Sequence, residues 1–370
     1  MRILYLSASY IPSQRASSVQ VMKMCHALAA GGHEVTLLAK DAPPTAHGLD
    51  DYAFYGVAEN FRLHKLARPA GRGGGVRYAG AVGRHLWAMR GCYDLVYSRD
   101  VWGAWLAAWL GRPVIFEAHG VPPPGFWRDQ QARLLRHPNL CRVVAISQAL
   151  SDELLRTGIL PDNKRVVIAH DGADAVPFTP PSANSQARPQ IGYVGNLYEG
   201  RGVELVARLA ATWPGGDFHI VGGNAKDVNA WAARTTSDNL HFHGFSPPAQ
   251  LSAAYDRFDV LLMPYQRQVR TATARSDTSR WMSPLKMFEY MATGRPIVAS
   301  ALPVLQEVLT HGYNALLAAP DSLAQWYAAL NELIRQPALA QRLGQQARQD
   351  LLEHYTWPVR AAKVLDGWQT

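Results

Sequence analysis

The sequence predicts an α/β protein with two domains, each built on a parallel β-sheet, and three observations lead to this fold class. The chain has 370 residues, which at roughly 150 residues per domain is enough for two buried cores. Short apolar runs of strand length alternate with amphipathic stretches of helix length, as in βα units. A Pro/Ser/Asn-rich segment at residues 176–189 interrupts this alternation once, and we expect the linker there.

The first half contains seven apolar runs that we expect to be strands. They are residues 3–7, 34–39, 61–66, 95–97, 114–117, 143–146 and 166–168. After the first run, Val19, Met22, His26 and Ala29 recur in steps of three and four, which predicts a helix that ends at the glycines 31–32. We therefore expect residues 1–180 to form one doubly wound domain.

The second half repeats the pattern with five further runs. They are residues 190–194, 218–221, 240–243, 260–263 and 296–300. We expect residues 190–352 to form a second domain of the same type. Because ligands bind at the carboxyl ends of the strands in such sheets, we expect a ligand in a cleft between the two domains.

Charge and cysteine content limit the class of partner and the compartment. The chain holds 37 Lys/Arg and 29 Asp/Glu, a net charge of +8, which predicts an anionic partner such as a phosphate-bearing substrate, an acidic membrane surface or a nucleic acid. The three cysteines, Cys25, Cys92 and Cys141, are too widely spaced for a zinc site or a disulfide scaffold. No signal-like or membrane-spanning apolar run is present, so we expect a cytoplasmic protein.

One segment concentrates the basic charge. Residues 60–93 carry seven basic side chains and no acidic one. The apolar residues of a helix predicted there share one face: Ala79, Val82, Leu86 and Met89. Arg77 and Arg84 lie on another face. Such a helix either packs its apolar face on its own sheet or lies on an anionic membrane surface, and the single sign of the charges keeps the second interpretation open.

The strongest local motif covers residues 283–300. Ser283 is expected as the N-cap and Pro284 as the first residue of a helix that Gly294 ends. A helix that begins at the carboxyl edge of a sheet offers unpaired N–H groups to a phosphate, and Lys286 adds a positive charge in the first turn. Glu289 can accept hydrogen bonds from two ribose hydroxyls. The alternative is an ordinary capped helix with Glu289 in solvent.

A second basic group follows the strand at residues 190–194. A glycine-bearing loop runs from Gly195 to Gly202, and Arg201 stands where a helix is expected to begin. Its guanidinium can grip a diphosphate in the same crevice. The alternative is a surface arginine that pairs with Glu204.

Together these segments resemble the retaining family-4 glycosyltransferases of the GT-B fold, also called group 1. Motifs at residues 27–36, 114–120, 167–178 and 355–357 follow the order of that family, and the resemblance covers almost the whole chain. It implies two Rossmann-like parallel-sheet domains that face each other across a cleft. It also implies that a last helix, within residues 353–370, crosses back to the first domain.

The resemblance also implies site residues. His119 would contact the transferred sugar, Arg201 and Lys286 would hold the diphosphate, and Glu289 would bind the ribose. The remaining positions that match the sugar-donor site are Ser17, Ser18, Gly195, Asn196, Gly244, Phe245, Ser283, Pro284 and Leu285.

The chain departs from the family pattern at three places. Trp281 stands where the family has the first glutamate of its Glu-x7-Glu motif, Asn196 replaces an arginine, and Ser17 and Ser18 replace a glycine pair in what we expect to be a loop. We interpret these changes as altered sugar recognition rather than loss of activity. Three further side chains are expected to replace some of the lost contacts: Asp277, Ser279 and Ser283.

The expected reaction is transfer of a sugar from a nucleoside-diphosphate sugar with retention of configuration. UDP is favoured as the nucleotide and GDP comes second. The chain has no Asp-x-Asp sequence and no metal-ligand spacing, so we expect neither a metal ion nor another cofactor.

The expected acceptor is a glycan or a lipid-linked glycan in cell-surface polysaccharide or glycoconjugate assembly, reached at the inner face of the plasma membrane. The aromatic pair Phe126 and Trp127 follows His119, and it either packs internally or meets a sugar or a lipid. A non-catalytic relative that binds nucleotide sugars or a partner is the alternative function. No nucleic-acid-binding motif is present, so we expect no nucleic acid as partner.

Overall fold

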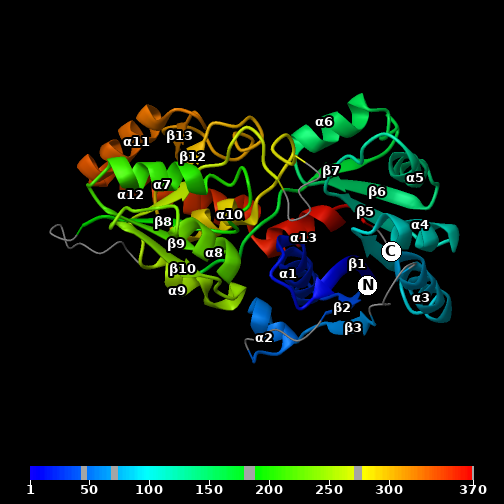
Figure 1. Cartoon of the computed structure of the whole chain (residues 1–370). Helices are drawn as coiled ribbons and strands as arrows, with labels where there is room; N and C mark the ends of the chain where they lie inside the picture. Colours follow the sequence, from blue (N-terminus) through cyan, green and yellow to red (C-terminus); the bar gives the residue numbers. More distant parts are fainter. Residues whose placement is uncertain (43–47, 68–73, 179–187, 271–276, 369–370) are drawn as a thin grey trace. The chain divides into compact units, whose positions relative to one another are not determined.

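The computed structural model describes residues 1–370 except 43–47, 68–73, 179–187, 271–276 and 369–370. The chain divides into two compact units (Figure 1). Unit 1 is Met1–Asp171 with Trp357–Thr370, and unit 2 is Gly172–Thr356. Most of the expected linker, residues 179–187 of 176–189, lies outside the described residues. The domain limits expected at 180, 190 and 352 stay predictions.

Unit 1 is built on a seven-stranded parallel sheet in the order β3-β2-β1-β4-β5-β6-β7. The strands are β1 (Arg2–Ile11), β2 (Glu34–Asp41), β3 (Arg62–Leu66), β4 (Leu95–Ser98), β5 (Val114–Ala118), β6 (Leu140–Ala145) and β7 (Val166–Ile168). The helices are α1 (Ala16–Ala30), α2 (Asp51–Tyr55), α3 (Gly74–Ala88), α4 (Val101–Trp109), α5 (Phe126–Leu135), α6 (Gln148–Arg156) and α13 (Trp357–Leu365). Each of the seven predicted runs overlaps one of these strands.

Unit 2 is built on a six-stranded parallel sheet in the order β10-β9-β8-β11-β12-β13. The strands are β8 (Gln190–Val194), β9 (Asp217–Val221), β10 (Leu240–Gly244), β11 (Val260–Met263), β12 (Ile297–Ser300) and β13 (Leu316–Ala318). The helices are α7 (Val203–Thr212), α8 (Ala225–Ala232), α9 (Leu251–Tyr255), α10 (Leu285–Thr293), α11 (Leu323–Arg335) and α12 (Pro337–Asp350), with short turns at η1 (Pro248–Gln250) and η2 (Leu351–Tyr355). The two parallel sheets confirm the predicted fold class.

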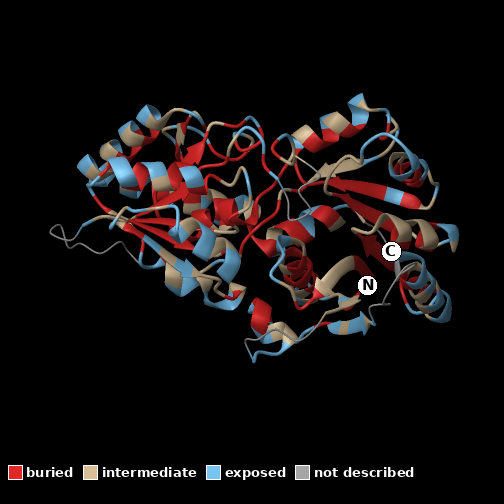
Figure 2. Cartoon of the chain, in the orientation of Figure 1, coloured by how far each residue is buried: buried red, intermediate tan, exposed pale blue. Residues whose placement is uncertain are grey.

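The central strands of each sheet are buried, as Figure 2 shows. β4, β5, β11 and β12 are buried at every residue, which explains why they read as continuous apolar runs. No residue of the edge strand β3 is buried: Arg62, His64 and Lys65 are exposed, and Leu63 and Leu66 are half-buried. Because parallel strands end at the same edge of a sheet, residues that follow β8, β9, β10 and β11 are brought to one edge of unit 2.

Helix α3 shows where the apolar face of the basic segment lies. Tyr78, Val82 and Leu86 are buried at 7%, 3% and 4% exposure. This face packs against α4, so the apolar face lies on its own unit, while Arg77 and Arg84 are exposed. The expected face is wrong at its end, because Met89 lies beyond the helix and is half-buried. In the described part of the chain, no helix is long and apolar enough to cross a membrane.

Candidate functional site

Two basic side chains of unit 2 meet in a cage of tyrosines. Lys286 lies in the first turn of α10 and is only 8% exposed. Its Nζ atom lies 3.8 Å from the centre of the Tyr193 ring and 5.1 Å from that of Tyr265. Arg201 donates a hydrogen bond of 2.8 Å from Nη1 to Tyr265 Oη. Tyr265 therefore contacts both cations and holds them in one place.

The cage leaves two donor atoms without a hydrogen-bond partner among the described residues: Lys286 Nζ and Arg201 Nε. Burial, and then the charge of Arg201, hold the pKa of Lys286 well below its usual range. Buried cations are normally paired with an anion. The arrangement therefore suits an anionic ligand, whose charge would raise the pKa of the lysine.

The loop after β8 packs directly against the side chain of Lys286. Gly195 has a φ of +151°, and a Cβ atom there would lie 2.7 Å from Lys286 Nζ. The next residue, Asn196, accepts a hydrogen bond of 2.6 Å on its carbonyl oxygen from Tyr193. Gly195 therefore lies against the lysine, and the carbonyl group of Asn196 fixes the orientation of the Tyr193 ring.

Arg201 precedes Gly202, the N-cap of α7, whose φ is +88°. A Cβ atom at this glycine would lie 1.9 Å from the carbonyl oxygen of Pro264. The loop before α7 and the segment after β11 are therefore in direct backbone contact. Arg201 is bound to Tyr265 rather than to Glu204, with which it forms no ion pair in the described structure.

The start of α10 differs by one residue from the prediction. Pro284, with a φ of −79° and a ψ of 124°, is the N-cap, and Leu285 is the first helical residue. Ser283 is therefore not the N-cap, because the proline ring is compatible with the extended conformation that a cap requires. Ser283, Pro284 and Leu285 are all buried beside Lys286 in the sequence. Gly294 ends the helix with a φ of +70°, as predicted.

Glu289 is half-buried rather than solvated. Its Oε2 atom accepts a hydrogen bond of 2.8 Å from Tyr255, which is buried in the short helix α9. The carboxylate is thereby fixed in orientation on α10, three residues after Lys286. The expectation that it binds a ribose stays a prediction.

The other predicted residues of unit 2 lie in loops or at strand ends. Gly244 ends β10 with a φ of +70° and accepts a hydrogen bond of 2.7 Å from the backbone of Gly222, and Phe245 beside it is half-buried. Trp281 is half-buried, with the Arg280 guanidinium 5.8 Å from its ring.

The expected replacements for the lost contacts are partly engaged in the fold. Asp277 accepts hydrogen bonds of 2.9 Å from the backbone N–H groups of Val269 and Ser279, so this oxygen shapes the loop. Ser279 and Ser283 are each 7% exposed. Their roles toward a ligand stay predictions.

The predicted residues of the first domain lie in unit 1. His119 follows β5, its side chain is 25% exposed, and its Nε2 atom lies 2.6 Å from Glu117 Oε1. Burial, and then the charge of Arg99, lower the pKa of His119 to about 4. The imidazole is therefore neutral near pH 7.

Ser17 and Ser18 are not in a loop. Both lie in the first turn of α1, since the β1–α1 connection is shorter than expected. Ser18 is fully buried and donates to the carbonyl oxygens of Ser13 and Arg15 at 2.8 and 2.7 Å. Its hydroxyl is used by the helix start, so it is not available to a ligand in this conformation.

The aromatic pair after His119 is exposed. Phe126 and Trp127 are 58% and 55% exposed at the start of α5. Both rings contact Trp102 of α4, with centroids 6.1 and 5.9 Å away. The three rings form an aromatic surface at the edge of the sheet where β4 and β5 end.

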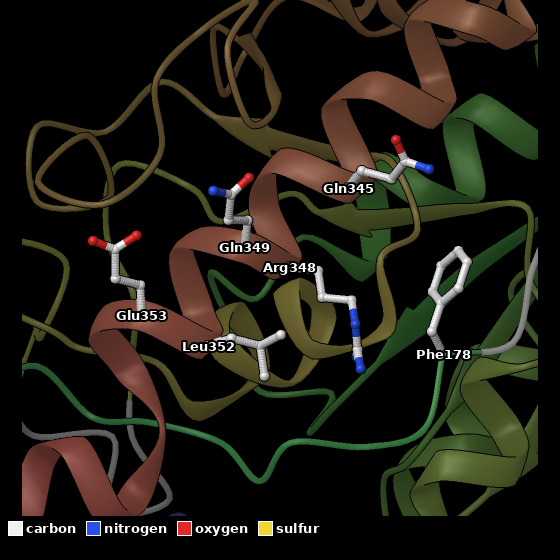
Figure 3. Close-up of a pocket in the computed structure, with 6 residues that line it drawn as sticks. All are labelled: Phe178, Gln345, Arg348, Gln349, Leu352 and Glu353. Carbon is white, nitrogen blue, oxygen red and sulfur yellow. The ribbon is translucent and has the colours of Figure 1, made fainter.

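A separate hollow of unit 2 is lined in part by Phe178, the last residue of the family motif at residues 167–178. It is lined by Phe178, Gln345, Arg348, Gln349, Leu352 and Glu353 (Figure 3). Arg348 donates a hydrogen bond of 2.6 Å to the carbonyl oxygen of Val176 and another to that of Ala292. Its guanidinium lies 5.8 Å from the centre of the Phe178 ring. A Cβ atom at Gly294 would lie 2.8 Å from the same ring. Phe178 therefore packs against the end of α10.

Sequence reasoning missed the side chains that hold the predicted ones. Tyr193 and Tyr265 contact Lys286, and Tyr265 also binds Arg201. Tyr255 binds Glu289, and Glu117 binds His119. Tyr193 and Tyr255 lie in apolar stretches where they read as ordinary core residues. The one usable signal was Glu117, a carboxylate inside an otherwise apolar run. Among the described residues there is no group of three or more His, Cys, Asp or Glu that could hold a metal ion.

Two family models match the chain. The model described as "Glycosyl transferases group 1" matches residues 188–336, and the "Glycosyl transferase 4-like domain" matches residues 16–172. The chain is 25% identical to a glycogen synthase of Mycobacterium tuberculosis over 96% of this chain and 92% of that protein. It is 24% identical to a GDP-mannose-dependent alpha-mannosyltransferase of Mycolicibacterium smegmatis over 100% and 97%.

Solved structures share the fold. Sucrose-phosphate synthase of Thermosynechococcus elongatus superposes with a TM-score of 0.74 at 17% identity, over 98% of this chain and 96% of that one. Anabaena Alr3699/HepE in complex with UDP gives 0.71 at 16% identity, over 99% of both chains. These likenesses show the GT-B fold, and with the two family models they lead to one conclusion. The chain is a group 1 glycosyltransferase of the family-4 type.

Proposed function

We propose that this glycosyltransferase moves a sugar from a nucleoside-diphosphate sugar to a glycan or a lipid-linked glycan, with retention of configuration and without a metal ion. The observation that carries the proposal is the tyrosine cage of unit 2, in which Lys286 Nζ and Arg201 Nε have no hydrogen-bond partner among the described residues. A diphosphate supplies both the charge and the acceptor oxygens that these groups need.

The leaving group of the reaction is the nucleoside diphosphate, on which negative charge develops as the glycosidic bond breaks. Lys286, Arg201 and the N-terminus of α10 are fixed before the reaction, so they stabilise this charge without reorganisation. One such group typically contributes about 3–4 kcal/mol at the transition state. In a retaining transfer without a protein nucleophile, the leaving phosphate oxygen takes the proton of the acceptor hydroxyl on the same face of the sugar.

We propose UDP as the nucleotide. The complex of the Anabaena protein with UDP supports this choice, because that protein shares the fold over nearly its full length. The relative from Mycolicibacterium smegmatis is GDP-mannose-dependent, so GDP is the second candidate. Glu289, fixed by Tyr255, is the group that we assign to the ribose common to both nucleotides.

A thermal-shift panel of nucleoside diphosphates and their sugars tests the sugar donor. We expect UDP and a UDP-sugar to raise the melting temperature, since a ligand at a hundred times its Kd stabilises by about 2.7 kcal/mol. Turnover of the same UDP-sugar should be unchanged by EDTA. A shift with GDP alone would replace UDP by GDP, and no shift with any nucleotide would contradict the proposed site.

We propose that the acceptor is reached at the inner face of the plasma membrane. The exposed arginines of α3 and the exposed ring of Trp87 support this, because basic and aromatic side chains both favour an anionic lipid surface. The buried apolar face of α3 takes no part. The aromatic surface of Trp102, Phe126 and Trp127 offers contact to a sugar or lipid group of the acceptor.

Co-sedimentation with vesicles tests the membrane proposal. We expect binding to vesicles that contain anionic lipid, and a fall of about 30-fold in the partition coefficient of the double variant Arg77→Gln, Arg84→Gln, at about 1 kcal/mol per basic residue. The double variant Arg234→Gln, Arg335→Gln removes the same charge from exposed positions of unit 2 and should bind normally. Equal binding of all three proteins would contradict the proposal.

A non-catalytic sugar-nucleotide-binding protein is the second candidate, favoured by Trp281 in place of an acidic residue. Turnover separates the two. Hydrolysis of the sugar donor by the purified protein, even slow and without acceptor, supports the enzyme, whereas binding without any turnover supports the non-catalytic protein.

A further inference from the structure

A fully buried carboxylate lies at the end of β5 in unit 1. Glu117 is 0% exposed, and four side chains donate hydrogen bonds to it. Oε1 accepts from Gln20 at 2.7 Å and from His119 at 2.6 Å. Oε2 accepts from Tyr97 and, at 3.0 Å, from Arg360. Every donor reaches it from a different element, so the carboxylate is held in a single orientation.

The charge of Glu117 is balanced inside the unit. Burial opposes its ionisation, but the charge of Arg360 and the hydrogen bond from His119 outweigh burial and hold its pKa well below the usual range. Arg360 lies in α13 and is 2% exposed. It also donates to the carbonyl oxygens of His170 and Ala169 at 2.8 and 3.2 Å. A pair this completely satisfied keeps Glu117 ionised, and an ionised carboxylate only accepts hydrogen bonds.

This charge state fixes the proton on the histidine. Because Glu117 only accepts, the proton of the neutral imidazole must lie on Nε2 of His119. Nδ1 then carries a lone pair. Nδ1 has no hydrogen-bond partner in the described part of the chain, and the side chain is 25% exposed.

We propose that Glu117 and Arg360 are positioning residues, which hold His119 as the Nε2–H tautomer so that Nδ1 accepts a hydrogen bond from a hydroxyl group of the substrate. This inference rests on the proposed function for the identity of the substrate as a sugar. It excludes a role of His119 as a donor to a phosphate oxygen, because a lone pair repels an anion. The ligand that suits Nδ1 is a hydroxyl group.

The positive charge of Arg99 favours the same neutral state of the histidine. Arg99 donates to Gln20, which in turn donates to Glu117, so a second guanidinium lies in the network. Asp171 lies 3.9 Å from Arg360, and burial raises the pKa of this aspartate to about 6. The aspartate is therefore mostly ionised at pH 7, but it faces the arginine, and among the described residues Glu117 is the carboxylate hydrogen-bonded to the imidazole.

NMR of the wild-type protein labelled with ¹⁵N-histidine tests the tautomer directly. The signal of His119 is assigned by its loss in His119→Gln. We expect Nε2–H and an unprotonated Nδ1 at pH 7, and no protonation down to about pH 5, because the pKa is lowered to about 4. An Nδ1–H tautomer, or a protonated ring at pH 7, would overturn the inference whether or not the protein transfers a sugar.

Variants then separate positioning from a purely structural role. Glu117→Gln keeps the size of the side chain but removes the charge, so we expect a mixture of tautomers and at least a tenfold fall in kcat, with the KM for the sugar donor unchanged. Arg360→Lys should restore part of the rate that Arg360→Gln loses, because the charge beside Glu117 returns.

Arg142→Gln is the matched control. Arg142 is also 2% exposed and donates to the carbonyl oxygens of Val364 and Asp366, so it ties the same end of the chain without touching Glu117. We expect lower thermal stability and an unchanged tautomer. If this control lowered kcat as much as Glu117→Gln, or if Glu117→Gln left both tautomer and kcat unchanged, the residues would serve the fold alone. If instead the proposed function is wrong, the thermal-shift panel shows no nucleotide binding. The two failures can therefore be told apart.

Discussion

Replacing Lys286 by methionine is expected to lower sugar transfer by a factor of about 10²–10³, the cost of removing one preorganised charge from the leaving group. The same change should raise stability in the absence of ligand. The lysine amino group is buried against Tyr193 without a hydrogen-bond partner among the described residues, and methionine fills a similar volume without an unpaired polar group. The gain should be about 1–3 kcal/mol, which corresponds to several degrees in melting temperature.

The measurements are kcat/KM for the sugar donor and the melting temperature of the free protein. Lys226→Met is the control, because Lys226 is an exposed lysine of the same unit. It should leave both quantities within error of the wild type. A Lys286→Met protein that is fully active, or one that melts earlier than the wild type, would contradict the role of the tyrosine cage as an anion site.

Replacing Gly202 by alanine is expected to destabilise unit 2 by about 3 kcal/mol or more. The residue has a φ of +88°, which costs an L-residue about 1–2 kcal/mol. The new Cβ atom would also lie 1.9 Å from the carbonyl oxygen of Pro264, a backbone atom that cannot move without shifting the segment after β11. Because Arg201 precedes this glycine, nucleotide binding should weaken together with stability.

Unfolding in urea measures the first effect, and Gly312→Ala separates strain from collision. Gly312 lies in the same unit with a φ of +72°, and a Cβ atom there would meet nothing within 4 Å. Its replacement should therefore cost only the conformational strain. Equal losses of unfolding free energy for the two variants would mean that the collision with Pro264 adds nothing to the cost of replacing Gly202.

The sheets could be predicted from the sequence because their strands are buried on both faces. Each predicted run overlaps a strand, and the apolar content of β11 and β12 needs no long-range information. β13 was missed because Leu316–Ala318 is three residues long and lacks the β-branched residues that marked the equally short β7. The start of α10 shifted by one residue because Ser283 and Pro284 both suit an N-terminus.

The site was only half predictable, for a physical reason. Charged residues such as Lys286 and Arg201 can be identified beside glycine loops, since their type already indicates phosphate chemistry. The tyrosines that hold them cannot be distinguished in the sequence from ordinary aromatic residues of the core. The pair of Glu117 and Arg360 is separated by 243 residues, and no periodicity relates two positions that meet only through the tertiary fold.

The discontinuity of unit 1 has a consequence for how the protein is made. Its sheet is complete at β7, but the guanidinium that pairs with Glu117 is supplied by α13, which follows the whole of unit 2 in the sequence. During synthesis β1 to β7 therefore leave the ribosome before the guanidinium that pairs with Glu117 and before the helix that packs against α1. Until α13 has emerged, we expect this nascent unit to stay protease-sensitive. Shortening the chain before position 357 should then yield an insoluble polypeptide rather than a smaller folded one.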